Sequence, residues 1–483
     1  MVNTGKPSGA CRTCLKKRIK GYRSSAELTF KDQNAYAAAK VEARQAQKFL
    51  QSQQQAHASQ PHLDISLPSS ILRAPSPAHL ITSTAIEHFS HDYALGTQPS
   101  PLFSTLPTQW SRSALQPALL EALPAVSLAN ACTRARAPDS ASASSSSSSP
   151  LLAAARHRYG AALARLATAL RRPAALRDKQ LLLALVLLNL FEMMSGDMPS
   201  AAGDRAEDLH YAGKVALLRM RGEEGLKDDD GRVLFRMVFA QVCVADLVAG
   251  RRPPCEGRRW LEVLWREGGG YLADGVLALE WEMAEFCARA GEVVKERAFD
   301  GGRRLQELLV EGEELFARLE GWAEGGGDEW QFEKKRSVGP RREGEVVEGC
   351  ETVHVYHNLI TATEWNFSRT LRIHLANTLL DLAARMRAVD PVLKLLTGVR
   401  QARWQRAALD LVDEICGGMA FILGDCRQGT KSRSFGAAVV GYQSLWPLRV
   451  ALTVGGIRDK QRAALMGWMR YIGHELGLQQ AVL

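Results

Sequence analysis

The stretch "LLLALVLLNLFEMM", residues 181–194, contains the longest unbroken aliphatic run of the chain, from Leu181 to Leu188. A helix that crosses a bilayer needs about 20 consecutive apolar residues, and this run soon meets Asn189 and Glu192. The run is therefore too short to span a membrane, and it predicts a helix buried in the protein core. We accordingly expect no membrane among the partners of the chain.

Two further segments have the apolar period of amphipathic helices: "RRLQELLVEGEELFARLEGW", residues 303–322, and "DKQRAALMGWMRYIGHELG", residues 459–477. Asp459 is the predicted N-cap of the second helix. The side chains expected on the two apolar stripes are Leu305, Leu308, Leu309, Leu315, Phe316, Leu319 and Trp322, and then Leu465, Trp468, Met469, Ile472 and Leu476.

Helical signals continue toward both ends of the chain. "STAIEHFSHDYAL", residues 83–95, offers Ser83 or Thr84 as an N-cap. Its predicted apolar face contains Ile86, Phe89 and Tyr93. Gly222 is the predicted C-cap of another helix. Because the alternation typical of strands is scarce, we predict an all-α fold for a body from about residue 81 to residue 483.

The composition is that of a globular protein, with 46% hydrophobic and 23% charged residues among 483. We predict a basic segment at 1–57, a disordered linker rich in proline and serine at 58–80, and the helical body at 81–483. Two mobile loops are predicted inside the body, at about 134–150 and 323–350. The first holds a serine run that has no apolar surface to bury, and the second is rich in glycine and charge.

Positive charge is concentrated at the start of the chain. Residues 1–50 contain eleven Lys or Arg and three acidic residues, so they hold eight of the nine net positive charges. A basic arm on a nearly neutral body indicates an acidic partner, with nucleic acid first, although a solvated or nuclear-targeting tail would have the same composition. The start "MVNTGKPSG" has no apolar signal region, so the nine cysteines are expected to be reduced thiols of a cytosolic or nuclear protein. Seven of them are expected to be small buried apolar side chains: Cys132, Cys243, Cys255, Cys287, Cys350, Cys416 and Cys426.

The stretch "GACRTCLKKRIKGYRSS", residues 9–25, combines a possible metal-binding pair with a basic run. Cys11 and Cys14 are spaced like two zinc ligands, but a closed structural zinc site needs four. A redox pair of this spacing would need a βαβ context, which the sequence lacks. The basic side chains after the pair suit contacts with phosphates and guanine bases, and they are Lys16, Lys17, Arg18 and Lys20.

This stretch resembles the first half of the zinc binuclear cluster of fungal transcription regulators, in which six cysteines hold two zinc ions. In that family the third cysteine stands after six residues beyond the second, and here that position is Gly21. The next residues, "GYRSSAELTFKDQN", are similar to the family segment just beyond the sixth cysteine. The resemblance implies zinc as the cofactor of the intact module and DNA as its partner, but four of the six cysteines have no counterpart here.

The body resembles the helical regulatory region of the same family. The similar segments are "LLLALVLLNLFEMMSGD" at 181–197, "LHYAGKVALLRMRGEEGL" at 209–226, "HVYHNLITATEWNFSRTLRIHL" at 354–375 and "YQSLWPLRVA" at 442–451. The resemblance implies a nuclear regulator linked to RNA polymerase II, with transcription machinery or other regulators as partners and a possible homodimer. A rival hypothesis is a helical interaction protein that has no specific DNA contact of its own.

Three short patterns suggest enzyme chemistry, and each is incomplete. "GDCRQGTKS", residues 424–432, has Thr430 where a phosphate-binding loop needs lysine. "DDDGR", residues 228–232, resembles the magnesium-binding cluster of helical terpene synthases but lacks a second motif, and a solvated turn is the simpler interpretation. His354 and His357 would suit one metal on a helix face, but no third ligand is nearby. Trp365, Trp446 and Trp468 are interpreted as core, and we expect no enzyme.

Overall fold

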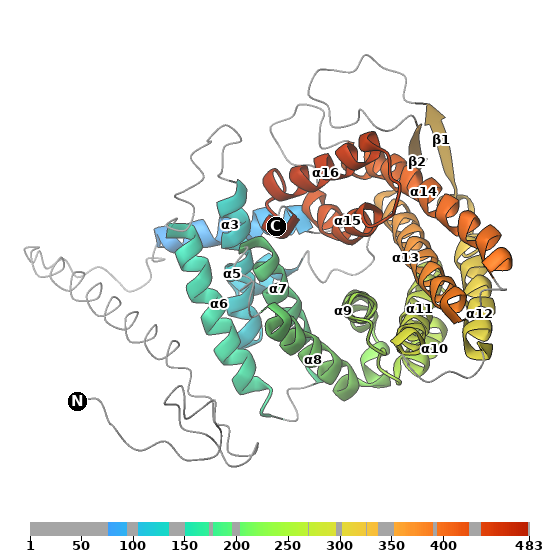
Figure 1. Ribbon diagram of the computed structural model, residues 1–483. Coiled ribbons are helices and arrows are strands. Elements are labelled where there is room, and N and C mark those ends of the chain that lie inside the picture. The colour runs from blue at the N-terminus through green and yellow to red at the C-terminus, as the bar shows by residue number, and fades with distance from the viewer. Residues whose placement is uncertain are drawn as a thin grey trace, which may run out of the picture. The chain divides into compact units, whose positions relative to one another are not determined.

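A computed structural model describes residues 76–93, 105–134, 150–172, 177–195, 203–268, 270–295, 302–324, 326–336, 352–389, 394–424 and 436–481. The chain divides into two compact units, Met1–Ala74 and Pro75–Leu483. All the described residues belong to the second unit, which is the helical body drawn in colour in Figure 1.

The N-terminal part of the body is a set of helices gathered around α5. These are α3 (Pro77–Tyr93), α4 (Leu106–Ser111), α5 (Pro117–Arg134), α6 (Pro150–Ala169), α7 (Lys179–Ser195) and α8 (Gly203–Arg221). Helix α5 packs against α3, α6 and α7, and α7 packs in turn against α8 (Figure 1). The buried helix predicted from residues 181–194 is α7, where every residue from Leu181 to Leu188 is buried.

The C-terminal part is gathered around the long helix α13. Its helices are α9 (Asp229–Ala249), α10 (Gly257–Glu267), α11 (Leu272–Lys295), α12 (Arg303–Glu320), α13 (Leu359–Val389), α14 (Lys394–Gly424), α15 (Ala437–Leu452) and α16 (Asp459–His474), with short 3₁₀ turns η4 (Glu223–Leu226), η5 (Asp328–Trp330) and η8 (Gln479–Ala481). Helix α13 contacts α11, α12, α14 and α15. The two parts join where α7 and α8 meet α9, where α7 meets η8 and where α15 meets α3. There the backbone amide of Gly436 donates to the carbonyl oxygen of His91 at 3.0 Å.

A two-stranded antiparallel sheet interrupts the helices, with β1 at Phe332–Arg336 and β2 at Thr352–Tyr356. Phe332 pairs with Tyr356, and Lys334 pairs with His354. The prediction of a loop over the whole of 323–350 is therefore wrong for η5 and β1, because β1 forms a ladder with β2. Residues 337–351 lie outside the described residues.

The predicted apolar stripes are buried. In α12 they are Leu305, Leu308, Leu309, Leu315, Phe316 and Leu319, and in α16 they are Leu465, Trp468, Met469 and Ile472, with Leu476 just beyond the helix. Ile86, Phe89 and Tyr93 of α3 are also buried. Trp322, Trp365 and Trp446 are partly buried against this core, and Trp468 is wholly inside it. The all-α fold class is confirmed.

Two predicted helix starts need correction. Helix α3 begins at Pro77, so Ser83 and Thr84 lie inside it and do not cap it; proline at a first helical position needs no backbone N–H. The boundary proposed at residue 81 consequently falls within this helix. Asp459 is the first residue of α16, and the N-cap is Arg458, whose backbone amide donates to Gln461 Oε1 at 2.8 Å. The C-cap predicted at Gly222 is confirmed, because α8 ends at Arg221 and Gly222 has a positive φ of 53°.

The cysteine prediction holds for Cys132, Cys243, Cys287 and Cys416, which are buried. It is wrong for Cys255, which is exposed in the turn before α10, beside Glu256. Cys350 and Cys426 lie outside the described residues. Among the helices that the structure describes, none is long and apolar enough to cross a membrane.

Candidate functional site

The residues predicted to contact DNA or zinc all lie in the first compact unit, outside the described residues: Lys16, Lys17, Arg18, Lys20, Cys11 and Cys14. Their roles stay predictions. The helical body contains a separate polar cluster, at the place where the sheet meets α13 and α14.

Arg369 of α13 is the centre of a buried polar cluster, and only 1% of its surface is exposed. Its Nε donates to Glu414 Oε2 of α14 at 3.1 Å. Its Nη1 donates to the hydroxyl of Tyr356 at 2.6 Å and to Asn366 Oδ1 at 2.8 Å. One guanidinium therefore binds three acceptors that come from β2, α13 and α14. We call Lys334, His354, Tyr356, Asn366, Arg369 and Glu414 the Arg369 cluster.

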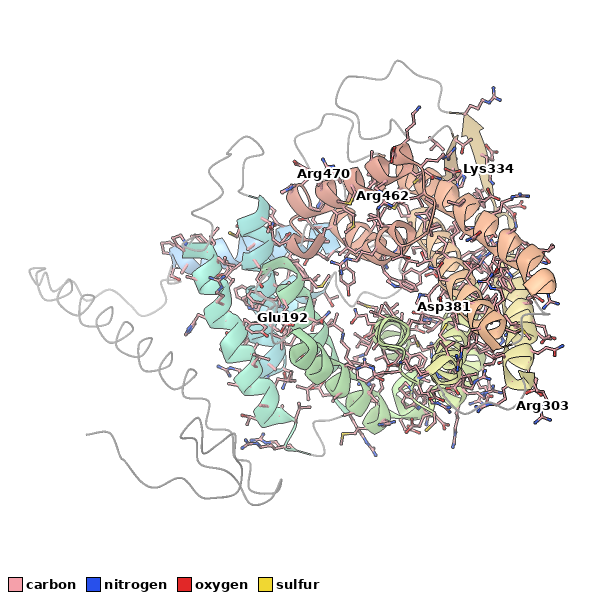
Figure 2. All side chains as sticks on the ribbon, viewed as in Figure 1. Glu192, Arg303, Lys334, Asp381, Arg462 and Arg470 are labelled. Carbon is pink, nitrogen blue, oxygen red and sulfur yellow. The ribbon has the colours of Figure 1, made fainter. Side chains whose placement is uncertain are left out.

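The sheet is tied to the same group through Lys334, which Figure 2 labels on β1. Lys334 Nζ donates to Glu414 Oε1 at 2.7 Å, so one carboxylate bridges two cations. Burial opposes the ionisation of Glu414, but Arg369 and Lys334 outweigh it and lower the pKa of this carboxyl. The guanidinium carbon also lies 5.0 Å from the ring centre of Phe332 and 5.3 Å from that of Trp365.

His354 is the second titratable group inside the cluster. Its Nδ1 lies 3.1 Å from the Tyr356 hydroxyl, which accepts from Arg369 and can donate to the imidazole. Burial, reinforced by the positive charge of Arg369, lowers the pKa of His354 to about 3. The imidazole is therefore neutral at physiological pH.

The hypothesis of a metal at His354 and His357 assumed that both lie on one helix face. The structure places His354 on β2 and His357 in the turn after it, where its side chain is exposed. No group of three or more His, Cys, Asp or Glu side chains in the described part of the chain is arranged to hold a metal ion.

The aspartates of "DDDGR" form the start of α9. Asp228 is the N-cap, and its Oδ1 accepts from the backbone amide of Gly231 at 2.8 Å. Lys179 Nζ lies 2.7 Å from Asp230 Oδ2, and Arg232 pairs with Asp229. These acids stabilise a helix start. The interpretation as a solvated turn therefore needs correction, because Asp229 and Asp230 belong to the first turn of α9. In "GDCRQGTKS" only Gly424, the last residue of α14, is among the described residues.

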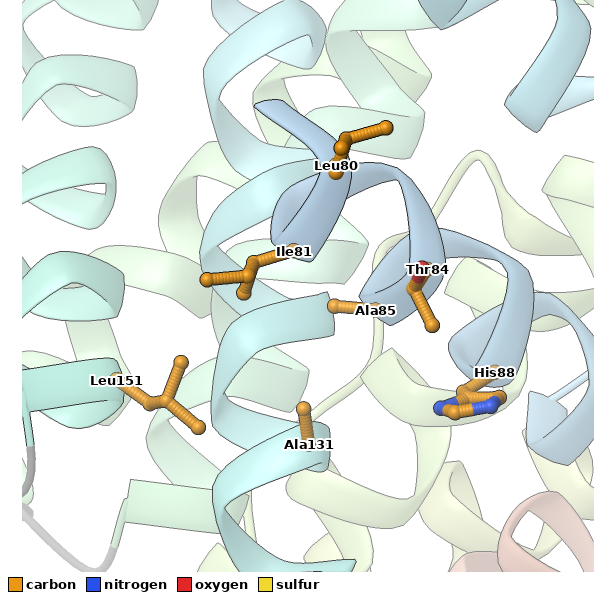
Figure 3. Close-up of a pocket in the computed structure, with 7 residues that line it drawn as sticks. All are labelled: Leu80, Ile81, Thr84, Ala85, His88, Ala131 and Leu151. Atoms are coloured by element: carbon orange, nitrogen blue, oxygen red, sulfur yellow. The ribbon is translucent and has the colours of Figure 1, made fainter. Parts of the chain in front are cut away.

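An open groove of about 500 Å³ lies between α3, α5 and α6 (Figure 3). Leu80 and Ile81 of α3 line the groove and are 51% and 52% exposed. Ala85 and Ala131 also line it, and their small side chains leave the space open. Thr84 and His88 supply the polar side chains of the lining, and Leu151 of α6 closes the far end. The sequence alone does not predict this groove, because its lining comes from three helices that are separate in the chain.

Residues 85–391 match the family model of the fungal specific transcription factor domain. The match covers more than half of the chain, and the chain belongs to this family. It is a family of transcription factor domains and not of enzymes. No curated protein and no solved structure matches the chain.

Proposed function

We propose that this protein regulates RNA polymerase II transcription in the nucleus and descends from the zinc-cluster regulators. One observation carries the proposal: the fungal specific transcription factor domain occupies residues 85–391. The partners proposed are DNA, through the basic arm, and transcription machinery or other regulators, through the helical body. The body is also proposed to act as a homodimer and to carry no catalytic activity.

The zinc donor set of the N-terminal segment does not fit a structural zinc site. Cys11 and Cys14 supply two thiolates, whereas one tetrahedral zinc needs four ligands. Zinc supplies the folding free energy of such small modules. Without it, the arm is proposed to bind DNA through its Lys and Arg side chains alone, with affinity that falls steeply with salt and depends little on base sequence.

The position of Gly21 favours a second candidate function. Where the third cysteine of the family pattern would stand, the chain has Gly21. A chain of this kind would act as a helical interaction protein that competes with an intact, six-cysteine form for partners. Sequencing the transcript across codons 20 and 21 separates the two functions. A longer message that encodes four more cysteines supports the DNA-binding regulator, and a message as written supports the competitor.

DNA binding by the purified protein tests the arm directly. Replacing Lys16, Lys17, Arg18 and Lys20 with Ala is expected to weaken binding equally on all DNA sequences and to reduce the salt dependence. As a matched control, four exposed cations of the body, Arg303, Lys335, Arg462 and Arg470, are replaced with Ala, and binding should stay as it was. A strong preference for one G/C-rich site that survives raised salt would contradict the non-specific mode.

A further inference from the structure

The exposed face of α16 presents a row of basic side chains with one apolar side chain among them. Arg462, Met466, Arg470 and His474 are all exposed and follow one another at intervals of four residues. Residues four apart are neighbours on one face of an α-helix, so the row is about 18 Å long. Figure 2 labels Arg462 and Arg470 on this helix. We call these four residues the α16 stripe.

The two arginines of the stripe have no ion-pair partner in the part of the chain that the structure describes. Arg458, just before the helix, differs from them because it is paired with Asp413. The opposite face of α16 is anchored in the core, where Leu465 and Trp468 are fully buried. Cations on a helix that is already fixed lose little backbone freedom when they bind a partner.

The positive charge of α16 is local. Residues 460–474 contain three Lys or Arg and no acidic residue. The residues after the basic arm, 51–483, hold only one of the nine net positive charges of the chain. A local excess of positive charge on a nearly neutral body favours a partner whose contact surface is negative.

Met466 restricts the kind of acidic partner. Its side chain is 41% exposed and lies midway between the two arginines of the stripe. A methionine adapts to an apolar partner side chain, which a phosphate backbone does not supply. Asp459 and Glu475 border the stripe at its two ends, where they would repel the continuous negative charge of a nucleic acid. A short acidic helix with an apolar residue on the same face suits both the cations and the methionine.

We propose that the α16 stripe binds an acidic amphipathic helix of a partner protein. The partner helix lies along α16, with carboxylates opposite Arg462 and Arg470 and an apolar side chain opposite Met466. Because the three residues follow at intervals of four, the recognised pattern is an acid, an apolar residue four positions later and a second acid after four more. This deepens the proposed function, in which the body contacts other regulators, and rests on it for the class of partner.

A synthetic helical peptide with Glu, Leu and Glu at these three positions is the probe, and it is added to the full chain. The matched peptide has the same residues in an order that puts the acids on the opposite face from the leucine. The methyl NMR line of Met466, assigned from its loss in Met466→Leu, reports on the stripe and not on the basic arm, which also attracts acidic peptides. The first peptide should shift this line in a saturable manner that weakens in raised salt, and the second should not.

Charge reversal tests the role of the arginines. Arg462→Glu combined with Arg470→Glu should weaken binding of the first peptide at least about tenfold, because two attractions become repulsions. The control combines Arg303→Glu with Lys335→Glu, the same change of charge at exposed positions of α12 and β1. It should keep the shift of the Met466 line. Circular dichroism should show the same helical signal for both variants, since all four side chains are exposed.

A Met466 line that neither peptide shifts, or that both shift equally, would overturn the proposal, and so would binding that survives the two charge reversals. Duplex DNA that shifts the line in place of the peptide would also overturn it, because the stripe would then be a nucleic-acid contact. The DNA test of the basic arm is independent of these outcomes. A chain that passes that test and fails this one keeps its proposed function and loses only this surface.

Discussion

Arg369 and Glu414 join the two 31-residue helices α13 and α14 inside the body, with Arg369 Nε 3.1 Å from Glu414 Oε2. The same carboxylate holds Lys334 of β1. The sheet and the two helices therefore share one partly buried ion pair, in which the Arg369 side chain is 1% exposed and that of Glu414 is 29% exposed. A buried pair need not stabilise a fold more than apolar residues would, but breaking it leaves a charge without a partner.

Replacing Arg369 with Met should lower the free energy of unfolding by about 3 kcal/mol, because Glu414 loses one of its two cationic partners and the Asn366 carbonyl loses its donor. Arg318→Met is the control, since Arg318 also pairs with a glutamate, Glu282, but at the surface. It should cost less than about 1 kcal/mol. Urea denaturation measures both. Equal losses of unfolding free energy in the two variants would mean that the Arg369–Glu414 pair stabilises the fold no more than a surface pair does.

The free energy of unfolding should depend on pH through the protonation of His354. Its pKa in the fold is about 3, held down by burial and by Arg369, while in the unfolded chain it is near the ordinary value of about 6.5. Between these values the unfolded chain binds the extra proton, so stability falls as the pH falls. From pH 7 to pH 5 the contribution is a loss of about 2 kcal/mol.

His354→Gln should remove that loss, whereas His357→Gln, which changes an exposed imidazole in the next turn, should retain it. Urea denaturation of both variants at pH 5, 6 and 7 provides the measurement. Parallel pH profiles of the two variants would show that His354 is protonated in the folded chain.

Glu280 of α11 should change the free energy of unfolding with pH in the opposite direction to His354. Burial first, and then the nearby Glu364, raise the pKa of this carboxyl well above its usual range, and its Oε1 has no hydrogen-bond partner in the described part of the chain. The folded chain keeps the proton, whereas the unfolded chain loses it above about pH 4.5. The free energy of unfolding therefore decreases as the pH rises. The decrease is about 1.4 kcal/mol for each pH unit above 4.5, until the carboxyl of Glu280 ionises in the folded chain.

Glu280→Gln should be increasingly more stable than the unaltered chain from pH 5 to pH 8, because the amide has no proton to lose. Glu282→Gln, on the same helix but partly exposed beside Arg318, should show no such trend. Thermal melts over this pH range make the comparison. A constant difference for Glu280→Gln would mean that Glu280 ionises in the folded chain.

The helices could be predicted from the sequence because their signals are local. The apolar run of α7 and the stripe of α12 repeat within a few turns, so burial can be inferred from spacing alone. The Arg369 cluster could not be predicted in this way. Its members come from β1, β2, α13 and α14, and only the folded chain brings Lys334 to Glu414. Arg369 lies in a segment that resembles the family, but nothing in its sequence neighbours indicates that it is buried.

Two glycines of α14 allow the effect of close packing on stability to be measured apart from the effect of helix propensity. Gly418→Ala would place a Cβ 2.5 Å from Asn366 Oδ1, and the overpacking should cost about 2 kcal/mol. Gly398→Ala meets nothing within 4 Å on the same helix, and it should stabilise the protein by about 0.7 kcal/mol. Thermal melts of the two variants should therefore shift in opposite directions. A stabilising Gly418→Ala would show that α13 and α14 are less closely packed than the distance implies.

The body should fold without the N-terminal arm and without zinc. Its compact unit starts at Pro75, and the buried core of the described residues lies within that unit. A shortened chain that begins at Pro75 should show the helical circular dichroism signal and melt with the full-length midpoint. A zinc chelator should leave both midpoints unchanged, because zinc contributes folding free energy only where it has a complete ligand set. Protease should cut first in the proline- and serine-rich stretches at 58–75 and 142–149, before α3 and within the serine run. A chelator that unfolds the body would instead make its cysteines and His354 metal ligands, and the assignment of Cys132, Cys243 and Cys416 to the apolar core would be wrong.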